Sequence, residues 1–156
     1  MGTNRRGSIE MTENEARSFL ENGRTIYLAS NGEDGYPHLI AMWYALDGDD
    51  IVMSTYRKSQ KVKNLLLDPR CTLLLEEGPV YAELQGLFLR GRCEVIDDEE
   101  TTLGTLRKVG ERASDGIPIP VSAEGALRAR AKKRVTLVFR AEKTRSWDHR
   151  KLGGGY

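Results

Sequence analysis

The chain has 156 residues, which is typical of one domain, with 30% charged residues and a formal net charge of +1. This balance argues against a general nucleic-acid-binding protein, which usually carries a strongly basic face. No apolar run approaches the ~18 residues that a membrane span needs, and no secretion signal is recognisable at the start. The only two cysteines, Cys71 and Cys93, lack metal-ligand spacing and lie in apolar runs, so we expect them reduced and buried in a cytoplasmic protein.

The first half of the chain predicts a helix and then a β-meander. We expect residues 1–11 to be a disordered leader and residues 12–156 to form a single domain. Thr12 and Glu15 have the capping-box spacing, which predicts a helix that ends at Asn22-Gly23. Turns rich in Gly, Asn and Asp then separate three predicted strands, over residues 25–29, 38–46 and 51–55.

The second half predicts three more strands with helices between them. Gly86 and Gly91 interrupt the fifth strand, where glycine is typical of a bulge, a barrel corner or a closely approaching ligand. No G-x-G-x-x-G follows a strand, so a dinucleotide-binding α/β fold is not expected. The expected fold class is α+β, mainly β, with a six-stranded antiparallel split barrel. Its remaining elements are a helix from Ser59 to Pro69, strands over 71–75 and 81–96, a helix from Asp97-Asp98 through Val109, a loop over 114–120, a helix over 122–131, a strand over 135–139 and a tail over 146–154.

The chemistry available to the side chains is limited, which favours a cofactor. The chain has two histidines and no G-x-S-x-G, H-E-x-x-H, Walker loop or CxxC. The best candidate site is the segment 54–61, which is rich in hydroxyl and basic residues where a strand runs into a helix. Hydroxyls, free amides and the helix dipole there can face an anion, with Arg57 binding phosphate oxygens in a fork. The alternative is that this turn is only a solvated surface.

Two other segments are weaker candidates. His38, Ile40 and Met42 share one side of the second strand, and Leu39, Ala41 and Trp43 share the other, so one side faces the core and the other a cleft or partner. The alternative is ordinary strand packing. Trp147 and its basic neighbours at 149–151 could cover a planar ligand or pack on the barrel rim. No pattern assigns a role to the loop 114–120.

Several stretches together resemble the pyridoxamine-phosphate-oxidase-like split-barrel superfamily, and within it the flavin and deazaflavin oxidoreductases that use coenzyme F-420. They occur in the same order and spacing across most of the chain, at residues 34–43, 54–65, 68–70, 86–91 and 146–152. Gln60 departs from the phosphate-oxidase pattern, which has an arginine there, and this weakens the case for pyridoxamine-phosphate oxidation.

The resemblance implies a homodimer with two cofactor sites at the subunit interface. Ser54, Thr55, Ser59 and Lys61 would hold the cofactor phosphate, and Arg57 and Lys58 would extend the cationic patch. The strand that begins at His38 would back the ring system through its main chain, and Trp147 and Lys151 would come from the partner subunit. The implied cofactor-binding residues are His38, Leu39, Ile40, Ala41, Met42, Ser54, Thr55, Arg57, Lys58, Ser59, Lys61, Gln85, Gly86, Trp147 and Lys151.

The function this implies is hydride transfer between reduced F-420, an 8-hydroxy-5-deazaflavin, and a small planar unsaturated substrate. Two alternatives stay open: an oxidase or reductase of the same fold that uses FMN or FAD, and a non-catalytic protein that binds a flavin, F-420 or haem. No catalytic acid is evident in the sequence. His38, His149, Tyr44 or water could protonate the product.

Overall fold

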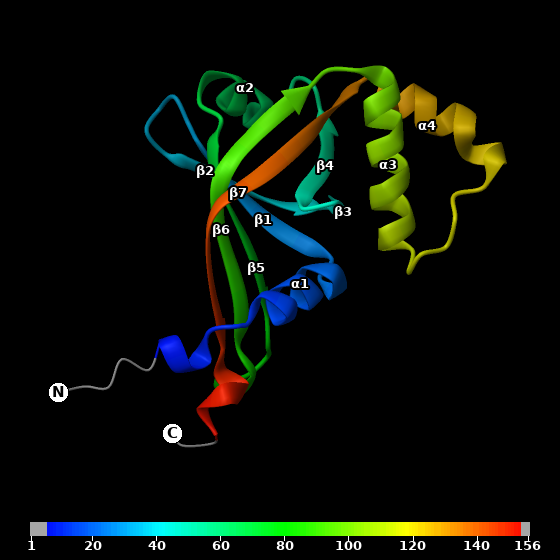
Figure 1. Ribbon diagram of the computed structural model, residues 1–156. Helices are drawn as coiled ribbons and strands as arrows, with labels where there is room; N and C mark the ends of the chain where they lie inside the picture. The colour runs from blue at the N-terminus through cyan, green and yellow to red at the C-terminus, as the bar shows by residue number, and fades with distance from the viewer. Residues whose placement is uncertain (1–5, 154–156) are drawn as a thin grey trace.

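The computed structural model describes residues 6–153 and contains one antiparallel sheet with helices packed around it (Figure 1). The strands are β1 (Thr25–Asn31), β2 (Pro37–Trp43), β3 (Ala45–Asp47), β4 (Asp50–Tyr56), β5 (Arg70–Glu77), β6 (Gln85–Ile96) and β7 (Arg134–Asp148). The helices are α1 (Glu13–Asn22), α2 (Gln60–Leu67), α3 (Glu99–Ala113) and α4 (Glu124–Ala131), with 3-10 turns η1 (Gly7–Ile9), η2 (Tyr81–Glu83), η3 (Val121–Ala123) and η4 (His149–Leu152).

The beginning of α1 confirms the predicted capping box. The Thr12 side chain accepts a hydrogen bond from the Glu15 amide, and the Glu15 carboxylate accepts one from the Thr12 amide. Of the expected disordered leader, residues 1–5 lie outside the described part of the chain, whereas Gly7–Ile9 form a 3-10 turn.

The sheet curls into a split barrel because its two edge strands are consecutive in the chain. The strand order is β2-β1-β5-β6-β7-β4-β3, so β2 and β3 lie at opposite edges. Only Tyr44 separates them, and this fully buried residue donates a hydrogen bond of 2.6 Å from its hydroxyl to the Leu20 carbonyl of α1. The antiparallel split barrel and the α+β class are therefore confirmed.

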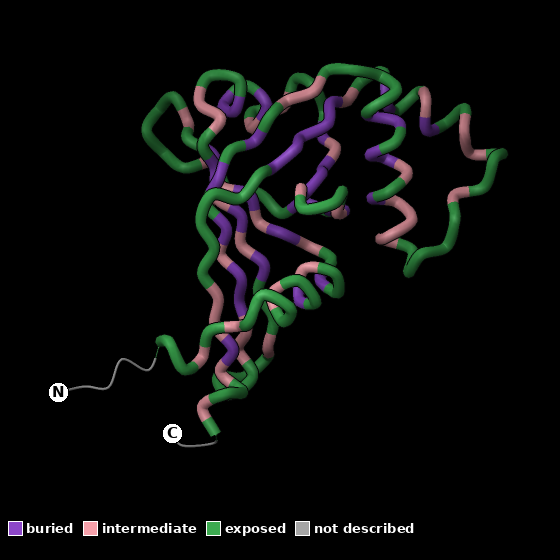
Figure 2. Tube along the Cα trace, viewed as in Figure 1, coloured by how far each residue is buried: buried purple, intermediate pink, exposed green. Residues whose placement is uncertain are grey.

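The strands differ from the prediction in three places. The expected fifth strand, 81–96, begins only at Gln85, because Tyr81–Glu83 form the 3-10 turn η2. The expected second strand, 38–46, is interrupted at Tyr44, so the sheet has seven strands rather than six. The expected sixth strand, 135–139, is β7, which continues to Asp148 and includes the first residues of the predicted tail. The alternation of apolar and polar residues that predicts this strand ends at Phe139, because residues 140–145 are exposed on both faces (Figure 2). Such alternation is visible only where one face of a strand is buried.

Gly91 is the position where β6 changes register against β7. The pairing shifts between Arg90 and Gly91, which confirms the predicted bulge. A Cβ atom on Gly91 would lie 2.0 Å from the Arg140 carbonyl oxygen, so only glycine permits the strands to approach at this point.

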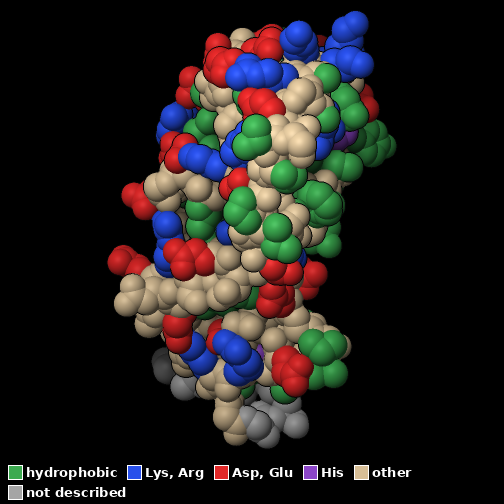
Figure 3. Space-filling model, turned by 90° about the vertical axis from the view of Figure 1, so that its right-hand side faces the viewer, with side chains coloured by type: hydrophobic (Ala, Val, Ile, Leu, Met, Phe, Trp, Pro, Cys, Tyr) green, Lys and Arg blue, Asp and Glu red, His purple; other side chains and the backbone are tan. Residues whose placement is uncertain are grey.

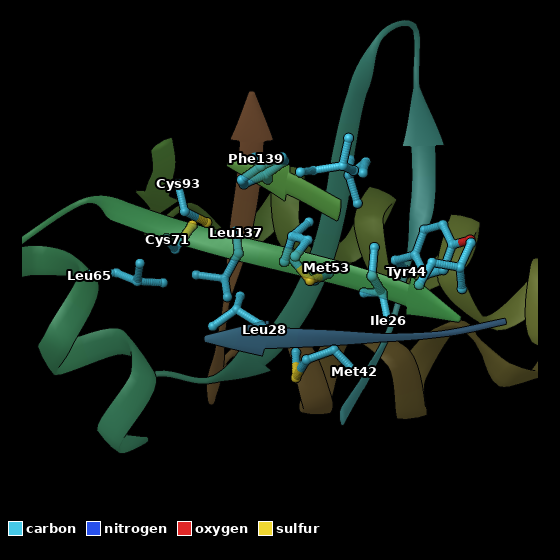
Figure 4. Close-up of a cluster of buried hydrophobic side chains, with 14 of the residues drawn as sticks. Ile26, Leu28, Met42, Tyr44, Met53, Leu65, Cys71, Cys93, Leu137 and Phe139 are labelled. Carbon is cyan, nitrogen blue, oxygen red and sulfur yellow. The ribbon is translucent and has the colours of Figure 1, made fainter. Parts of the chain in front are cut away.

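The core fills the interior of the curled sheet (Figure 4). Inward-facing side chains from six strands and from α1 and α2, among them Leu28, Met53, Leu65 and Leu137, form one buried cluster. The two cysteines belong to it as free, buried thiols, as the sequence predicts. No helix within residues 6–153 is long and apolar enough to cross a membrane.

Candidate functional site

The barrel is split between β2 and the end of β4. β2 has a single neighbour, β1, so its other edge is free. On the far side of the split, β3 pairs only with the first part of β4, through Asp50–Val52, and Ser54 lies beyond that pairing. The backbone groups along these two edges are thus available to a ligand placed between them.

The turn between β4 and α2 places two serine hydroxyls at one end of this split. Ser54 is near the end of β4, and Ser59 immediately precedes α2. Both Oγ atoms are buried, and neither has a hydrogen-bond partner among residues 6–153. Since buried hydroxyls are normally hydrogen-bonded, these two are suited to the polar atoms of a ligand. Ser59 is the N-cap residue of α2, and a helix N-terminus favours an anion.

Lys61 adds a partly buried positive charge to the same corner. Its Nζ donates a hydrogen bond of 3.0 Å to Oγ1 of the buried Thr55. Burial lowers the pKa of the Lys61 ammonium, and the charge of Arg134 lowers it further. Within the described chain no carboxylate pairs with Lys61. An anion bound here would supply the missing counter-charge.

Arg57 and Lys58 lie in the same turn but have different surroundings. Arg57 forms an ion pair of 2.8 Å with Asp97, which raises the pKa of its guanidinium. It also donates a hydrogen bond of 2.9 Å to the Lys132 carbonyl. Arg57 therefore ties the turn to the chain before α3 and after α4, whereas Lys58 is exposed.

A groove of about 530 Å³ opens beside this corner, within the usual size of small-molecule sites. One wall is the free edge of β2 with Ser54, and the other is α3 with the loop that follows it. The lining residues are Ala41, Met42, Trp43, Ser54, Leu106, Val109, Gly110, Ala113, Ser114, Ile119, Arg130 and Arg134. Figure 3 shows the α3–α4 side of the molecule, where hydrophobic side chains gather in the upper half and Lys and Arg side chains lie at the top.

The loop 114–120, which the sequence left without a role, supplies part of the second wall through Ile119. Arg107 donates a hydrogen bond of 3.4 Å to the Ile119 carbonyl, and the Ile119 amide donates one of 3.3 Å to Glu111. A Cβ atom on Gly110 would lie 2.9 Å from Cδ1 of Ile119, so this side chain is seated directly over the glycine. The loop is thereby fixed to α3.

Two arginines that the sequence analysis did not identify also line the groove. The Arg134 guanidinium lies 4.1 Å from the centre of the Tyr56 ring and donates a hydrogen bond of 3.4 Å to the Ser54 carbonyl. Arg130 reaches the groove from α4 and is exposed. Both are more than 70 positions from the β4–α2 turn in sequence, and only the pairing of β4 with β7 brings them there.

The predicted β2 residues divide along the length of that strand. Ala41 and Met42 line the groove, together with Trp43. Leu39 and Ile40 are exposed, whereas His38 lies in a separate depression beside α2, where its Nδ1 is buried without a partner in the described chain.

The remaining predicted residues lie at the other end of the molecule, where β7 ends (Figure 1). Gly86 faces Trp147 across the strand pair, and a Cβ atom there would lie 1.9 Å from the indole. Gln85 is 3.4 Å from Asp148, and the Lys151 ammonium lies 2.6 Å from Glu15. None of these residues lines the groove of its own chain.

None of the three proposed proton donors lines the groove either. The Tyr44 hydroxyl donates its hydrogen bond to the Leu20 carbonyl of α1, and burial raises its pKa. The His149 ring hydrogen-bonds the Tyr81 carbonyl at 2.8 Å, and His38 lies beside α2. Among residues 6–153, no group of His, Cys, Asp and Glu is arranged to hold a metal ion.

A curled antiparallel sheet that is split between β2 and β4 defines a split β-barrel. The family model described as pyridoxamine 5'-phosphate oxidase matches residues 12–148, so the chain belongs to this family.

Solved structures include several similar chains. A conserved hypothetical protein, Rv2991 from Mycobacterium tuberculosis, is 40% identical, with a TM-score of 0.89 over 99% of this chain and 95% of that one. A chain described as an F-420 reductase is 26% identical, with a TM-score of 0.64 over 82% and 94%. An FAD-binding protein from Mesorhizobium loti shares the fold at 16% identity, with a TM-score of 0.65 over 88% and 94%. Among curated proteins no match is found.

Proposed function

We propose that the chain is an oxidoreductase that binds coenzyme F-420 in the groove and transfers hydride to a small planar unsaturated substrate. The observation that carries the proposal is the β4–α2 segment, in which the hydroxyls of Ser54 and Ser59 are buried without a partner among residues 6–153 and the Lys61 ammonium has no carboxylate partner there. The similarity to an F-420 reductase supports the choice of cofactor.

The residues present fit such a cofactor at both of its ends. Ser54, Ser59 and Lys61 would hold a phosphate, and the free edge of β2 would hydrogen-bond the polar edge of a planar ring. F-420 has a phosphodiester and a polyglutamate tail, so it is more anionic than FMN. Arg134, whose charge acts on Lys61, gives the groove extra positive charge that this ligand would need.

A reduced deazaflavin held here would supply a hydride, and the acceptor would gain that hydride and one proton. The chain would hold the cofactor and the acceptor in a reactive orientation. The apolar side chains of Leu106, Val109 and Ile119 exclude solvent from one side of the groove. Among the described residues that line the groove only Arg130 and Arg134 are ionisable, so we propose that water provides the proton.

We further propose that the protein works as a homodimer in the cytoplasm. Ala41, Tyr27, Leu74 and Phe88 are cross-strand neighbours on four adjacent strands, and none of the four is buried. A continuous apolar row of this kind is typical of a protein contact. Trp147 cannot line the groove of its own chain, but a partner could place it there. Light scattering should give twice the 17.5 kDa of one chain, and Phe88→Glu should yield monomers.

The test is a fluorescence titration of the cofactor-stripped protein with F-420, FMN, FAD and haem. Micromolar or tighter binding of F-420, with much weaker binding of the others, would support the proposal. A preference for FMN or FAD would assign the chain to the flavin enzymes of the same fold. Binding of F-420 without turnover of any acceptor would indicate a carrier, and binding of none of them would contradict the cofactor assignment.

A further inference from the structure

The two arginines that line the groove differ in whether they already have interaction partners within the chain. Arg134 is stacked on Tyr56 and bonded to the Ser54 carbonyl, and its charge acts on Lys61, so it belongs to the phosphate corner. Arg130 lies on α4 and lines the same groove without an ion-pair partner in the part of the chain that the structure describes.

The lack of a partner distinguishes Arg130 from its neighbours on the α3–α4 pair. Arg128 forms ion pairs with Glu100 and Glu124, and Arg107 also pairs with Glu124. The carboxylates of this region are thus shared among other arginines, and the Arg130 guanidinium is left to bind an anion from solution. A guanidinium binds a carboxylate through two parallel hydrogen bonds.

The wall next to Arg130 is apolar and includes a small residue that permits a flat molecule to approach. Leu106, Val109 and Ile119 supply its hydrophobic surface, and Ala113 keeps it shallow. Because Ile119 is fixed to α3 through Arg107 and Glu111, this surface is already formed in the free protein. Preorganisation of this kind reduces the entropic cost of binding.

We propose that Arg130 binds the carboxylate of the hydride acceptor while Ile119 and Val109 pack against its planar body. The substrate class would then be planar unsaturated carboxylic acids. This inference rests on the proposed function, because it places the acceptor beside the ring that the free edge of β2 would hold.

Calorimetric titrations with trans-cinnamate and its neutral amide, trans-cinnamamide, test the inference with and without saturating F-420. The wild type should bind the acid at least about tenfold more tightly than the amide, as expected for one charge-assisted pair. Arg130→Gln should lose this preference. Lys132→Gln, which removes an exposed charge two residues away, should keep it. Ile119→Ala should weaken both ligands by a similar factor.

Three results would overturn the inference. One is equal affinity of the wild type for the acid and the amide, and another is a preference that survives in Arg130→Gln. The third is a loss of F-420 affinity in Arg130→Gln, which would assign this arginine to the cofactor tail and leave the proposed function standing. Failure of the wild type to bind F-420, with the acid preference intact, would remove the proposed function and leave Arg130 as a carboxylate-binding residue without a hydride acceptor.

Discussion

Replacing Lys61 with methionine removes one charge from the phosphate corner and leaves a side chain of similar length. The ammonium is partly buried, lies 3.0 Å from the Thr55 hydroxyl and has no carboxylate partner in the described chain. In the proposed complex it would form a charge-assisted hydrogen bond with the cofactor phosphate. Loss of such a bond costs about 1.5–3 kcal/mol, so F-420 should bind roughly 10- to 150-fold more weakly.

The matched control is Lys63→Met on the same helix. Lys63 is exposed and two residues away, so its replacement removes the same formal charge without altering the buried corner. A fluorescence titration should show a change of less than about threefold for this variant, as expected for a solvated charge. If the two variants weaken F-420 equally, the corner acts only through its net charge, and the argument from the buried hydroxyls is wrong.

Comparison of the wild type with Lys61→Met also predicts a pH dependence of the free energy of unfolding, which can be measured without cofactor. Burial holds the pKa of Lys61 below its usual value of 10.5, so the unfolded chain binds more protons than the folded one between the two pKa values. Stability contributed by this residue therefore rises with pH in that interval. The free energy of unfolding of the wild type, measured relative to Lys61→Met, should increase as the pH approaches 10.5. A difference that is constant with pH would refute the burial of the ammonium.

Two other substitutions test the end of the sheet where β7 finishes, and Gly104→Ala on α3 is a comparison for the first of them. Gly86→Ala should destabilise the protein by about 1–3 kcal/mol in urea, because its Cβ would meet the Trp147 indole at 1.9 Å. Gly104→Ala meets no atom within 4 Å and should instead be stabilising. Asp148→Asn should cost about 1–2 kcal/mol at neutral pH, because the Arg150 hydrogen bond holds the Asp148 pKa below its usual 3.8. That difference should disappear in acid, as the wild-type carboxylate becomes protonated; its persistence at low pH would contradict the ion-pair argument.

The sequence by itself determined most of the local structure. The Thr12–Glu15 capping box, the turns rich in Gly, Asn and Asp, and the alternation of the inner strands act between near neighbours, so they can be recognised without coordinates. The resemblance to a known family made it possible to predict the fold and the cofactor-binding role of the β4–α2 turn as well. The prediction was least accurate at β7, whose second half is exposed and carries no alternation to recognise.

Only the tertiary structure decided which charges and surfaces meet in the groove. Arg57 belongs to a predicted phosphate-binding motif, but the fold pairs it with Asp97, which lies 40 positions away. Arg130 and Arg134 belong to no motif, and the pairing of β4 with β7 brings them to the groove. Ile119 reaches it because the loop is bonded back onto α3. These contacts join residues distant in sequence, and they form because the sheet curls until β2 faces β4, which no local pattern specifies.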